Sequence, residues 1–250
     1  MTTLKVKLVD TNLQKRRVST SRRKRSSSLS DVSGAKCPSM MLSVRSSPNT
    51  DHDYRAVFHV KDDIYCYPDS NVLRNMLGIT DYDELVSAEG RLTLIAMIRL
   101  DADPVKGCFD TDHLRAIHRC IFKDIYDWAG EFRTVEISKG VPFCYCANIQ
   151  SQLDSIFSQL HKENLLKDIT DRGQYVSRLA YYFGELNAVH PFREGNGRTQ
   201  RKFIQQLVVE SGHLISFMRL DPRRMIDAAS DSMVCDYRKM ESLITDLLTF

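Results

Sequence analysis

The sequence lacks any apolar run of roughly 18 or more residues, and its N-terminus lacks the apolar core of a signal peptide. The first absence excludes a membrane-spanning helix, so we expect no membrane partner. Because no export signal is visible, we expect a cytoplasmic protein. The sequence does not decide between the producing cell and a host cell into which the protein is secreted.

Cysteine and histidine follow no pattern that is typical of a zinc site. The seven cysteines are an odd number at irregular spacings. Cys144 and Cys146 are separated by one residue, whereas a zinc knuckle has roughly two to four between its cysteines. His113 and His118 lie five positions apart, which is not the spacing that brings two ligands onto one helix face. We therefore expect reduced thiols and structural histidines.

Acidic residues are scarce in residues 1–50, where 11 Lys and Arg stand against 2 Asp and Glu, a net charge of +9. The whole chain carries +3, so the remainder carries −6. Because residues 1–50 are also rich in Ser and poor in large apolar residues, we predict a disordered basic tail. Such a tail is compatible with a nucleic-acid contact, a localisation signal, a secretion determinant or no function at all. The acidic remainder argues against DNA binding by the folded part.

The rest of the chain has the composition of a folded domain, because 42% of all residues are hydrophobic and 27% are charged. We predict one mostly α-helical domain over residues 51–250. Apolar residues indicate helices at about 81–100, 111–128, 149–166, 175–188, 198–211 and 222–250. Over residues 131–147 the period changes, which predicts a short β-hairpin around Ser-Lys-Gly.

A polar stretch, HPFREGNGRTQR at residues 190–201, joins two of the expected helices. Gly195 and Gly197 can take backbone angles that other residues avoid, so successive N–H groups can turn inward as an anion nest. The helix that follows adds the partial positive charge of its N-terminus. Arg198 and Arg201 lie three positions apart on that helix, and their planar guanidinium groups suit phosphate. The stretch therefore predicts a polyphosphate site.

The same stretch holds one carboxylate and one base. Glu194 is most simply interpreted as a Mg²⁺ ligand, because Mg²⁺ at nucleotide sites takes about one or two carboxylates with phosphate oxygens and water. His190 is then available as a general base, since its ordinary pKa lies near working pH. A His before Pro, or a single Gly-x-Gly, is weak evidence for a functional site by itself, whereas the joint pattern is specific.

HPFREGNGRTQR resembles the signature of the Fic (Fic/Doc) family at every position of its pattern, which is HPF-x-(D/E)-GNGR-x-x-R. The resemblance extends over about residues 64–220. It implies a single helical domain with a hairpin flap, and transfer of AMP from ATP to a Tyr, Ser or Thr hydroxyl of a target protein. In such an enzyme His190 takes the hydroxyl proton, Glu194 holds Mg²⁺, and Asn196 helps to form a hole around the α-phosphate. Arg198 and Arg201 neutralise the outer phosphates.

The resemblance also assigns roles outside this stretch. Arg74 and Asn75 lie in a segment that is near the adenine and ribose in family members, although on physical grounds alone Asn75 is better explained as a helix-surface or capping residue. The expected hairpin corresponds to a flap over the active site, to which a target strand can add by main-chain hydrogen bonds. Lys139 and Gly140 at its tip, and Phe143 on the return strand, are candidates for positioning target or nucleotide. A solvated tip is the alternative for Lys139.

The transferred group and its regulation depend on further details. Some relatives act as kinases and carry Lys where this chain has Gly197, and others move UMP or phosphocholine, so the intact motif favours AMP. Many relatives are inhibited by an internal Glu that pairs with the second arginine, here Arg201, within a motif of Ser or Thr, three residues, Glu, and Gly or Asn. Neither Glu89 nor Glu163 fits, because Leu85 and Gln159 stand at the Ser/Thr position.

Glu194 belongs to the stretch itself and so is not the inhibitory residue. We therefore expect either inhibition by a separate antitoxin-like protein or no inhibition.

A second hypothesis is that the domain has the same fold but no catalytic activity. In it the domain is a scaffold that binds a partner strand at the flap, and the basic tail recruits nucleic acid or an acidic partner.

Overall fold

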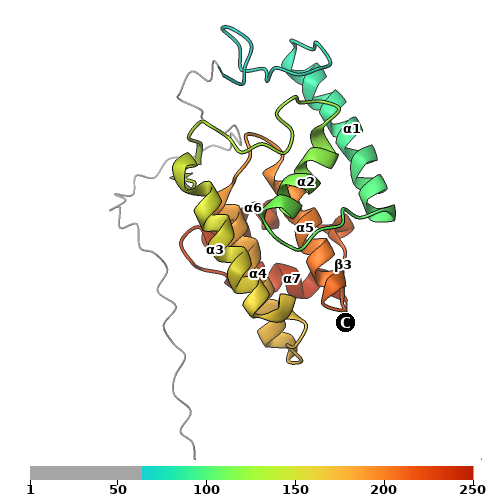
Figure 1. The fold of residues 1–250 in the computed structure, drawn as a ribbon, viewed down its shortest axis with the longest axis vertical. Coiled ribbons are helices and arrows are strands. Elements are labelled where there is room, and N and C mark those ends of the chain that lie inside the picture. Colours follow the sequence, from blue (N-terminus) through green and yellow to red (C-terminus); the bar gives the residue numbers. More distant parts are fainter. Residues whose placement is uncertain (1–63, 250) are drawn as a thin grey trace, which may run out of the picture. The chain divides into compact units, whose positions relative to one another are not determined.

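The computed structural model describes residues 64–249, which all lie in the unit Ser47–Phe250 (Figure 1). The predicted basic tail lies outside the described residues, so its boundary with the domain stays a prediction. The helices are α1 Tyr82–Ala102, α2 Thr111–Phe122, α3 Ile149–Lys162, α4 Arg172–Val189, α5 Asn196–Glu210, α6 Pro222–Ser232 and α7 Arg238–Leu247. The strands are β1 Ser138–Lys139, β2 Val141–Pro142, β3 Leu214–Ile215 and β4 Leu248–Thr249. The prediction of a mostly helical fold is confirmed.

Aspartates set the first residue of several helices. An Asp side chain accepts a hydrogen bond from a first-turn backbone N–H at the N-caps of α1, α2, α4 and α6, which are Asp81, Asp110, Asp171 and Asp221. Each such cap contributes about 1 kcal/mol to stability. Two helices are shorter than their apolar patterns suggest. α2 ends at Phe122 in a tight turn, and α3 ends before Asn164 and Leu165, which both have left-handed backbone angles.

The core is built around α4, which packs against α3, α5, α6 and α7. Figure 1 shows α3 and α4 running side by side. The α4 side chains Leu179, Phe183 and Leu186 are almost completely buried, as are Phe203 and Leu207 of α5. Since α4 ends and α5 begins at the polar stretch 190–201, burial of these two helices fixes both ends of that stretch.

The predicted hairpin is present but short. β1 pairs with β2 in antiparallel register, Lys139 opposite Val141, and both strands are exposed. Beyond these residues the Phe143 N–H donates to the Ile137 carbonyl at 3.2 Å, and both arms also bond to the end of α4 and the loop after it. The Arg133 N–H donates to the Pro191 carbonyl at 2.9 Å, and the Cys144 N–H donates to the Ala188 carbonyl at 3.0 Å. The flap is therefore anchored at its base to the same loop that carries His190.

Two expectations about the whole chain are tested by the described residues. No helix within residues 64–249 is long and apolar enough to cross a membrane. Cysteines 66, 108, 120, 144 and 146 are free thiols. Cys235 is disulfide-bonded, so the expectation of reduced cysteines is wrong for this residue.

Candidate functional site

The loop between α4 and α5 begins and ends with a left-handed residue. His190 caps the C-terminus of α4 with φ 46° and ψ 60°, and Gly195 precedes α5 with φ 79°. Between these two residues the chain reverses direction, and α5 starts with backbone N–H groups that have no carbonyl of their own helix to bond. N–H groups of this kind, together with the positive end of the helix dipole, favour an anion at a helix N-terminus.

The two glycines of the loop have different reasons to be glycine. At Gly195 the backbone angle is left-handed, and an added Cβ would lie 2.1 Å from Cζ of Phe122 at the end of α2. Gly197 lies inside α5, where an added Cβ would meet only the end of the Arg201 side chain, at 3.2 Å. The prediction of special backbone angles is therefore confirmed for Gly195 and wrong for Gly197, which instead leaves room for Arg201.

This difference predicts unequal effects of two substitutions. Gly195→Ala places a Cβ against the buried Phe122 ring at a left-handed residue, and we expect it to lower the free energy of unfolding by about 3 kcal/mol. Gly197→Ala adds a methyl group within a helix and is expected to change the free energy of unfolding by less than about 1 kcal/mol. Urea denaturation of both variants measures the difference. Equal effects would contradict this account of the loop.

His190 is held in one orientation and one tautomer. Its Nδ1 lies 3.2 Å from the Asn187 carbonyl, so Nδ1 carries the proton and donates. Among the described residues, Nε2 has no hydrogen-bond partner and keeps its lone pair. The ring stacks on Phe143 of the flap, with centroids 3.9 Å apart and planes 15° apart. Burial lowers the pKa of His190 from 6.5 to about 3, and the positive charges of Lys139 and Arg133 act in the same direction. The imidazole is neutral at pH 7.

The flap candidates therefore lie close to the predicted base. Phe143 is buried and contacts His190 directly, which makes it a support for the imidazole ring. Lys139 is exposed and acts on His190 by charge. Gly140 forms the tip between β1 and β2, with φ 73° and open space around it. None of these contacts tests whether the flap positions a target or a nucleotide.

Asn196 and Glu194 have different exposure. Both polar groups of the Asn196 side chain bond the backbone of Phe192, at 2.9 and 2.7 Å, and the residue is 4% exposed. The Asn196 side chain therefore closes the loop, and the backbone N–H of Asn196 has no carbonyl of its own helix to bond. The Glu194 side chain is 43% exposed. One of its oxygens accepts the Gly195 N–H at 2.7 Å and lies 3.3 Å from Arg198.

The two arginines of α5 differ in their partners. The Arg198 guanidinium lies 2.5 Å from Glu89 of α1, 3.2 Å from the Thr93 hydroxyl and over the Phe122 ring. Arg201 has no acidic partner within the described part of the chain. Burial lowers the pKa of Arg201, and the charge of Arg198 adds to that effect. A partly buried cation without a carboxylate favours an anionic ligand beside it.

The two candidates from the segment before α1 have structural contacts. The Asn75 amide donates to the carbonyls of Leu73 and Ile79, at 2.9 and 2.7 Å, and its oxygen accepts the Ile79 N–H at 3.0 Å. Asn75 lies in a turn before α1, whose N-cap is Asp81, so the interpretation as a helix-surface or capping residue is wrong and its side chain instead closes this turn. Arg74 donates from Nε to the Cys66 carbonyl at 2.9 Å, and its role toward a nucleotide stays a prediction.

Arg133 is an important residue that the sequence reasoning missed. Its side chain is completely buried, and it donates to the carbonyls of His190 and Val135 at 2.9 Å and to that of Cys144. Arg133 therefore connects the flap to His190, the predicted base. The sequence did contain a signal. Arg133 lies two positions before Val135 and four before Ile137, so in an extended segment all three side chains point to the same, inward-facing side.

The His118 side chain packs against the loop between α4 and α5, which confirms the structural role predicted for it. Its ring is fully buried between Phe122 and Phe192, with centroid distances of 4.7 and 3.9 Å. Nδ1 accepts the Gly130 N–H at 2.8 Å, so Nε2 donates to the Glu194 carbonyl at 3.0 Å. Burial lowers its pKa to about 3, partly offset by that hydrogen bond. His113 is likewise bonded, to Val105 and Gln206. Within residues 64–249 no cluster of potential metal ligands is present.

The neutral state of His118 and His190 predicts a loss of stability in mild acid. Both pKa values are lowered from 6.5 to about 3, so between these pH values the unfolded chain binds more protons than the folded one. Stability is therefore fully present above pH 6.5 and declines as pH falls toward 3. Near pH 5 we expect each histidine to lower the free energy of unfolding by about 2 kcal/mol. Urea denaturation near pH 7.5 and pH 5 measures this loss, and equal midpoints would contradict it.

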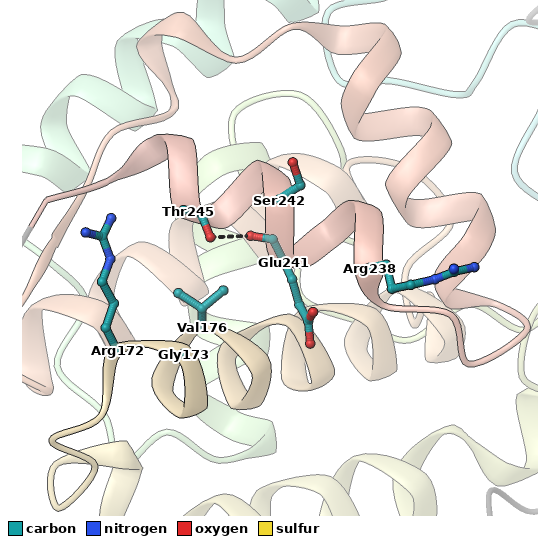
Figure 2. A pocket seen from close by; sticks show the side chains of 7 residues that line it. All are labelled: Arg172, Gly173, Val176, Arg238, Glu241, Ser242 and Thr245. Atoms are coloured by element: carbon teal, nitrogen blue, oxygen red, sulfur yellow. Dashed lines mark hydrogen bonds between the residues drawn. The ribbon is translucent and has the colours of Figure 1, made fainter.

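A surface hollow of about 400 Å³ lies elsewhere, between the start of α4 and α7 (Figure 2). Arg172, Val176, Glu241 and Thr245 are among its lining residues. It sits at the opposite end of α4 from His190, roughly 25 Å away along the helix. Arg238 at its edge is already paired with Asp236. The hollow is thus separate from the loop.

Comparisons with known proteins point to one family. The Fic/DOC family model matches residues 108–208. The curated Protein adenylyltransferase VbhT of Bartonella schoenbuchensis is 39% identical over 189 residues, which are 75% of this chain. The chain spans only 39% of that relative's length. The Escherichia coli protein named "Probable protein adenylyltransferase Fic" is 32% identical over 189 residues, 75% of this chain and 92% of that protein.

Solved structures agree with this. BepC, a VirB-translocated effector of Bartonella tribocorum crystallised with AMPPNP, is 25% identical with a TM-score of 0.69, and covers 75% of this chain and 97% of its own. The N-terminal Fic domain of a Bep effector of Bartonella quintana with bound ADP is 29% identical with a TM-score of 0.70. That match covers 75% of this chain and 95% of the other.

Proposed function

Because the chain belongs to the Fic/DOC family, we propose that it is a protein adenylyltransferase. It transfers AMP from ATP to a Tyr, Ser or Thr hydroxyl of another protein and releases pyrophosphate. One observation carries the proposal. A single short loop joins a neutral imidazole, whose Nε2 has no hydrogen-bond partner within residues 64–249, to the N-terminus of a helix that bears Arg198 and Arg201.

The triphosphate of ATP would lie against the first turn of α5. The N–H groups of Asn196, Gly197 and Arg198 would donate to its oxygens, since they lack partners within the helix. Arg201, which has no carboxylate partner among the described residues, would neutralise the outer phosphates, and Arg198 would assist. Gly197 leaves the space that the Arg201 guanidinium needs to stay near the helix N-terminus.

Glu194 has the chemistry of a Mg²⁺ ligand. Its carboxylate is a hard oxygen ligand, is 43% exposed, and lies beside the proposed phosphate site. The remaining ligands would be phosphate oxygens and water, as is usual for this ion. When bound, Mg²⁺ would supply positive charge that neutralises the phosphates.

His190 would carry out the proton transfer. The target hydroxyl gives its proton to Nε2, its oxygen attacks the α-phosphorus, and the bond from that phosphorus to the bridging oxygen breaks to release pyrophosphate. A pKa of about 3 in the free protein makes a weak base. The negative charge of bound ATP would raise this pKa toward the working range. Positioning and charge stabilisation would supply most of the remaining rate enhancement.

The flap would hold the target. β1 and β2 are both exposed, so their outer backbone groups can pair with an extended target segment. Main-chain pairing would fix the hydroxyl near His190 with little dependence on neighbouring side chains. Lys139, Gly140 and Phe143 would then position the target or nucleotide. Arg74 would contact the nucleoside, and Asn75 would act by holding the turn beside Arg74.

The surroundings of the reaction are part of the proposal. ATP is a cytoplasmic metabolite, so the enzyme would act in a cytoplasm, either of its own cell or of a host cell that receives it. An antitoxin-like protein would inhibit it by neutralising Arg201. Any nucleic-acid contact would be confined to residues 1–50, which lie outside the described residues.

Labelled ATP tests the proposed activity. The protein is incubated with bacterial or eukaryotic lysate, Mg²⁺, and ATP labelled at either the α- or the γ-phosphate. We expect a labelled protein band from α-labelled ATP only. A band from γ-labelled ATP would indicate a kinase. No band from either, together with no Mg²⁺-dependent ATP binding in calorimetry, would favour the scaffold hypothesis.

A further inference from the structure

Glu89 of α1 is brought to the loop although it lies 109 residues before Arg198 in the sequence. Its oxygen Oε1 is 2.5 Å from Nη2 of Arg198, and the two side chains are only 14% and 22% exposed. Thr93, one helical turn further along α1, contacts Nη1 of the same guanidinium at 3.2 Å. α1 therefore holds Arg198 by two of its nitrogens.

The second oxygen of Glu89 is also occupied. The buried Tyr126 hydroxyl donates to Oε2. Burial raises the pKa of Tyr126, and the Glu89 carboxylate adds to that, so the phenol stays protonated as a donor. Tyr126 and Arg198 thus fix the Glu89 carboxylate from both sides.

Two carboxylates compete for one nitrogen of Arg198. Nη2 lies 2.5 Å from Glu89 and 3.3 Å from Glu194, the residue proposed to hold Mg²⁺. A guanidinium paired fully with Glu194 would occupy its oxygens and repel a cation from them. The shorter contact to Glu89 means that the more buried carboxylate binds Arg198 more closely.

We propose that Glu89 is a positioning residue for metal-dependent nucleotide binding: by holding Arg198 on the α1 side, it leaves the Glu194 carboxylate available to Mg²⁺. This inference rests on the proposed function, and it deepens that function by assigning a role to α1. Glu89 differs from the inhibitory glutamate of related proteins in two respects. It contacts Arg198 and not Arg201, and Leu85 precedes it at the Ser/Thr position.

The test is calorimetry of AMPPNP binding over a series of Mg²⁺ concentrations. Glu89→Gln keeps the shape of the side chain and removes its charge, so Arg198 is free to pair with Glu194. We expect the Mg²⁺ concentration for half-maximal binding to rise about tenfold, with binding at saturating Mg²⁺ changed by less than about threefold. Tyr126→Phe, which removes only the donor behind Glu89, is expected to give a smaller rise in the same direction.

A matched control exists on the same pair of helices. Asp101 of α1 pairs with Lys202 of α5 at 2.6 Å, away from the loop. Asp101→Asn therefore removes an ion pair between α1 and α5 without touching Arg198, and its Mg²⁺ dependence should equal that of wild type. Thermal melting of all variants checks folding, and Tyr126→Phe replaces Glu89→Gln if the latter does not fold.

The outcomes separate this inference from the proposed activity. If wild type transfers AMP and Glu89→Gln has the Mg²⁺ dependence of Asp101→Asn, the role of Glu89 is wrong and the adenylyltransferase stands. Faster AMP transfer by Glu89→Gln would also overturn the inference, because Glu89 would then inhibit the reaction. If wild type binds no AMPPNP at any Mg²⁺ concentration, both proposals fail.

Discussion

Replacing His190 with Ala is expected to slow AMP transfer by about 10²- to 10⁴-fold, the usual contribution of a positioned general base. The variant should still bind ATP, since the proposed phosphate contacts come from the first turn of α5 and from Arg201. Initial rates of transfer from α-labelled ATP and calorimetric ATP binding, measured on the same preparation, separate these two effects.

His161 on α3 supplies a control for the loss of a histidine. It is exposed and lies outside the loop, so His161→Ala should transfer AMP at the wild-type rate. Wild-type activity in His190→Ala would remove His190 from the mechanism. Lost ATP binding would show instead that the ring is needed to shape the loop.

Replacing Arg133 with Met is expected to lower the free energy of unfolding by about 3–5 kcal/mol. Met has a similar length but no donors, so the carbonyls of His190, Val135 and Cys144 would lose a buried partner. The loss is a large fraction of the roughly 5–15 kcal/mol that a domain of this kind has in total. Urea denaturation measures it, and AMP transfer should fall as well because the flap loses its anchor to His190.

Arg119→Met is the matched control for this change. Arg119 is 56% exposed and pairs at the surface with Glu131, an interaction that contributes less than about 1 kcal/mol. The two Arg→Met variants should therefore differ by several kcal/mol. A similar, small effect of both would mean that the Arg133 hydrogen bonds do not support the flap.

Local patterns predicted much of the fold. Apolar periodicity located the long helices, because each packs apolar side chains against at least one neighbouring helix. The change of period over residues 131–147 located the hairpin. Its short length was not predictable, since the arms bond to the end of α4, and a pairing between distant segments leaves no local signal.

The loop was predictable in composition and less so in its contacts. Residue types alone indicated an anion site with a base, but not that the Asn196 side chain is used to close the loop. Gly195 and Gly197 look alike in the sequence, and only the contact with Phe122 distinguishes them. The link from Glu89 to Arg198 depends on how α1 packs, which no spacing in the sequence encodes.

The most direct test of the central claim is a crystal structure of the protein with AMPPNP and Mg²⁺. We predict a triphosphate bound against the first turn of α5, a metal ion on Glu194, and Nε2 of His190 directed at the α-phosphate. A nucleotide bound elsewhere, with the loop empty or with Nε2 directed away from the phosphates, would contradict the proposal that this loop performs the transfer.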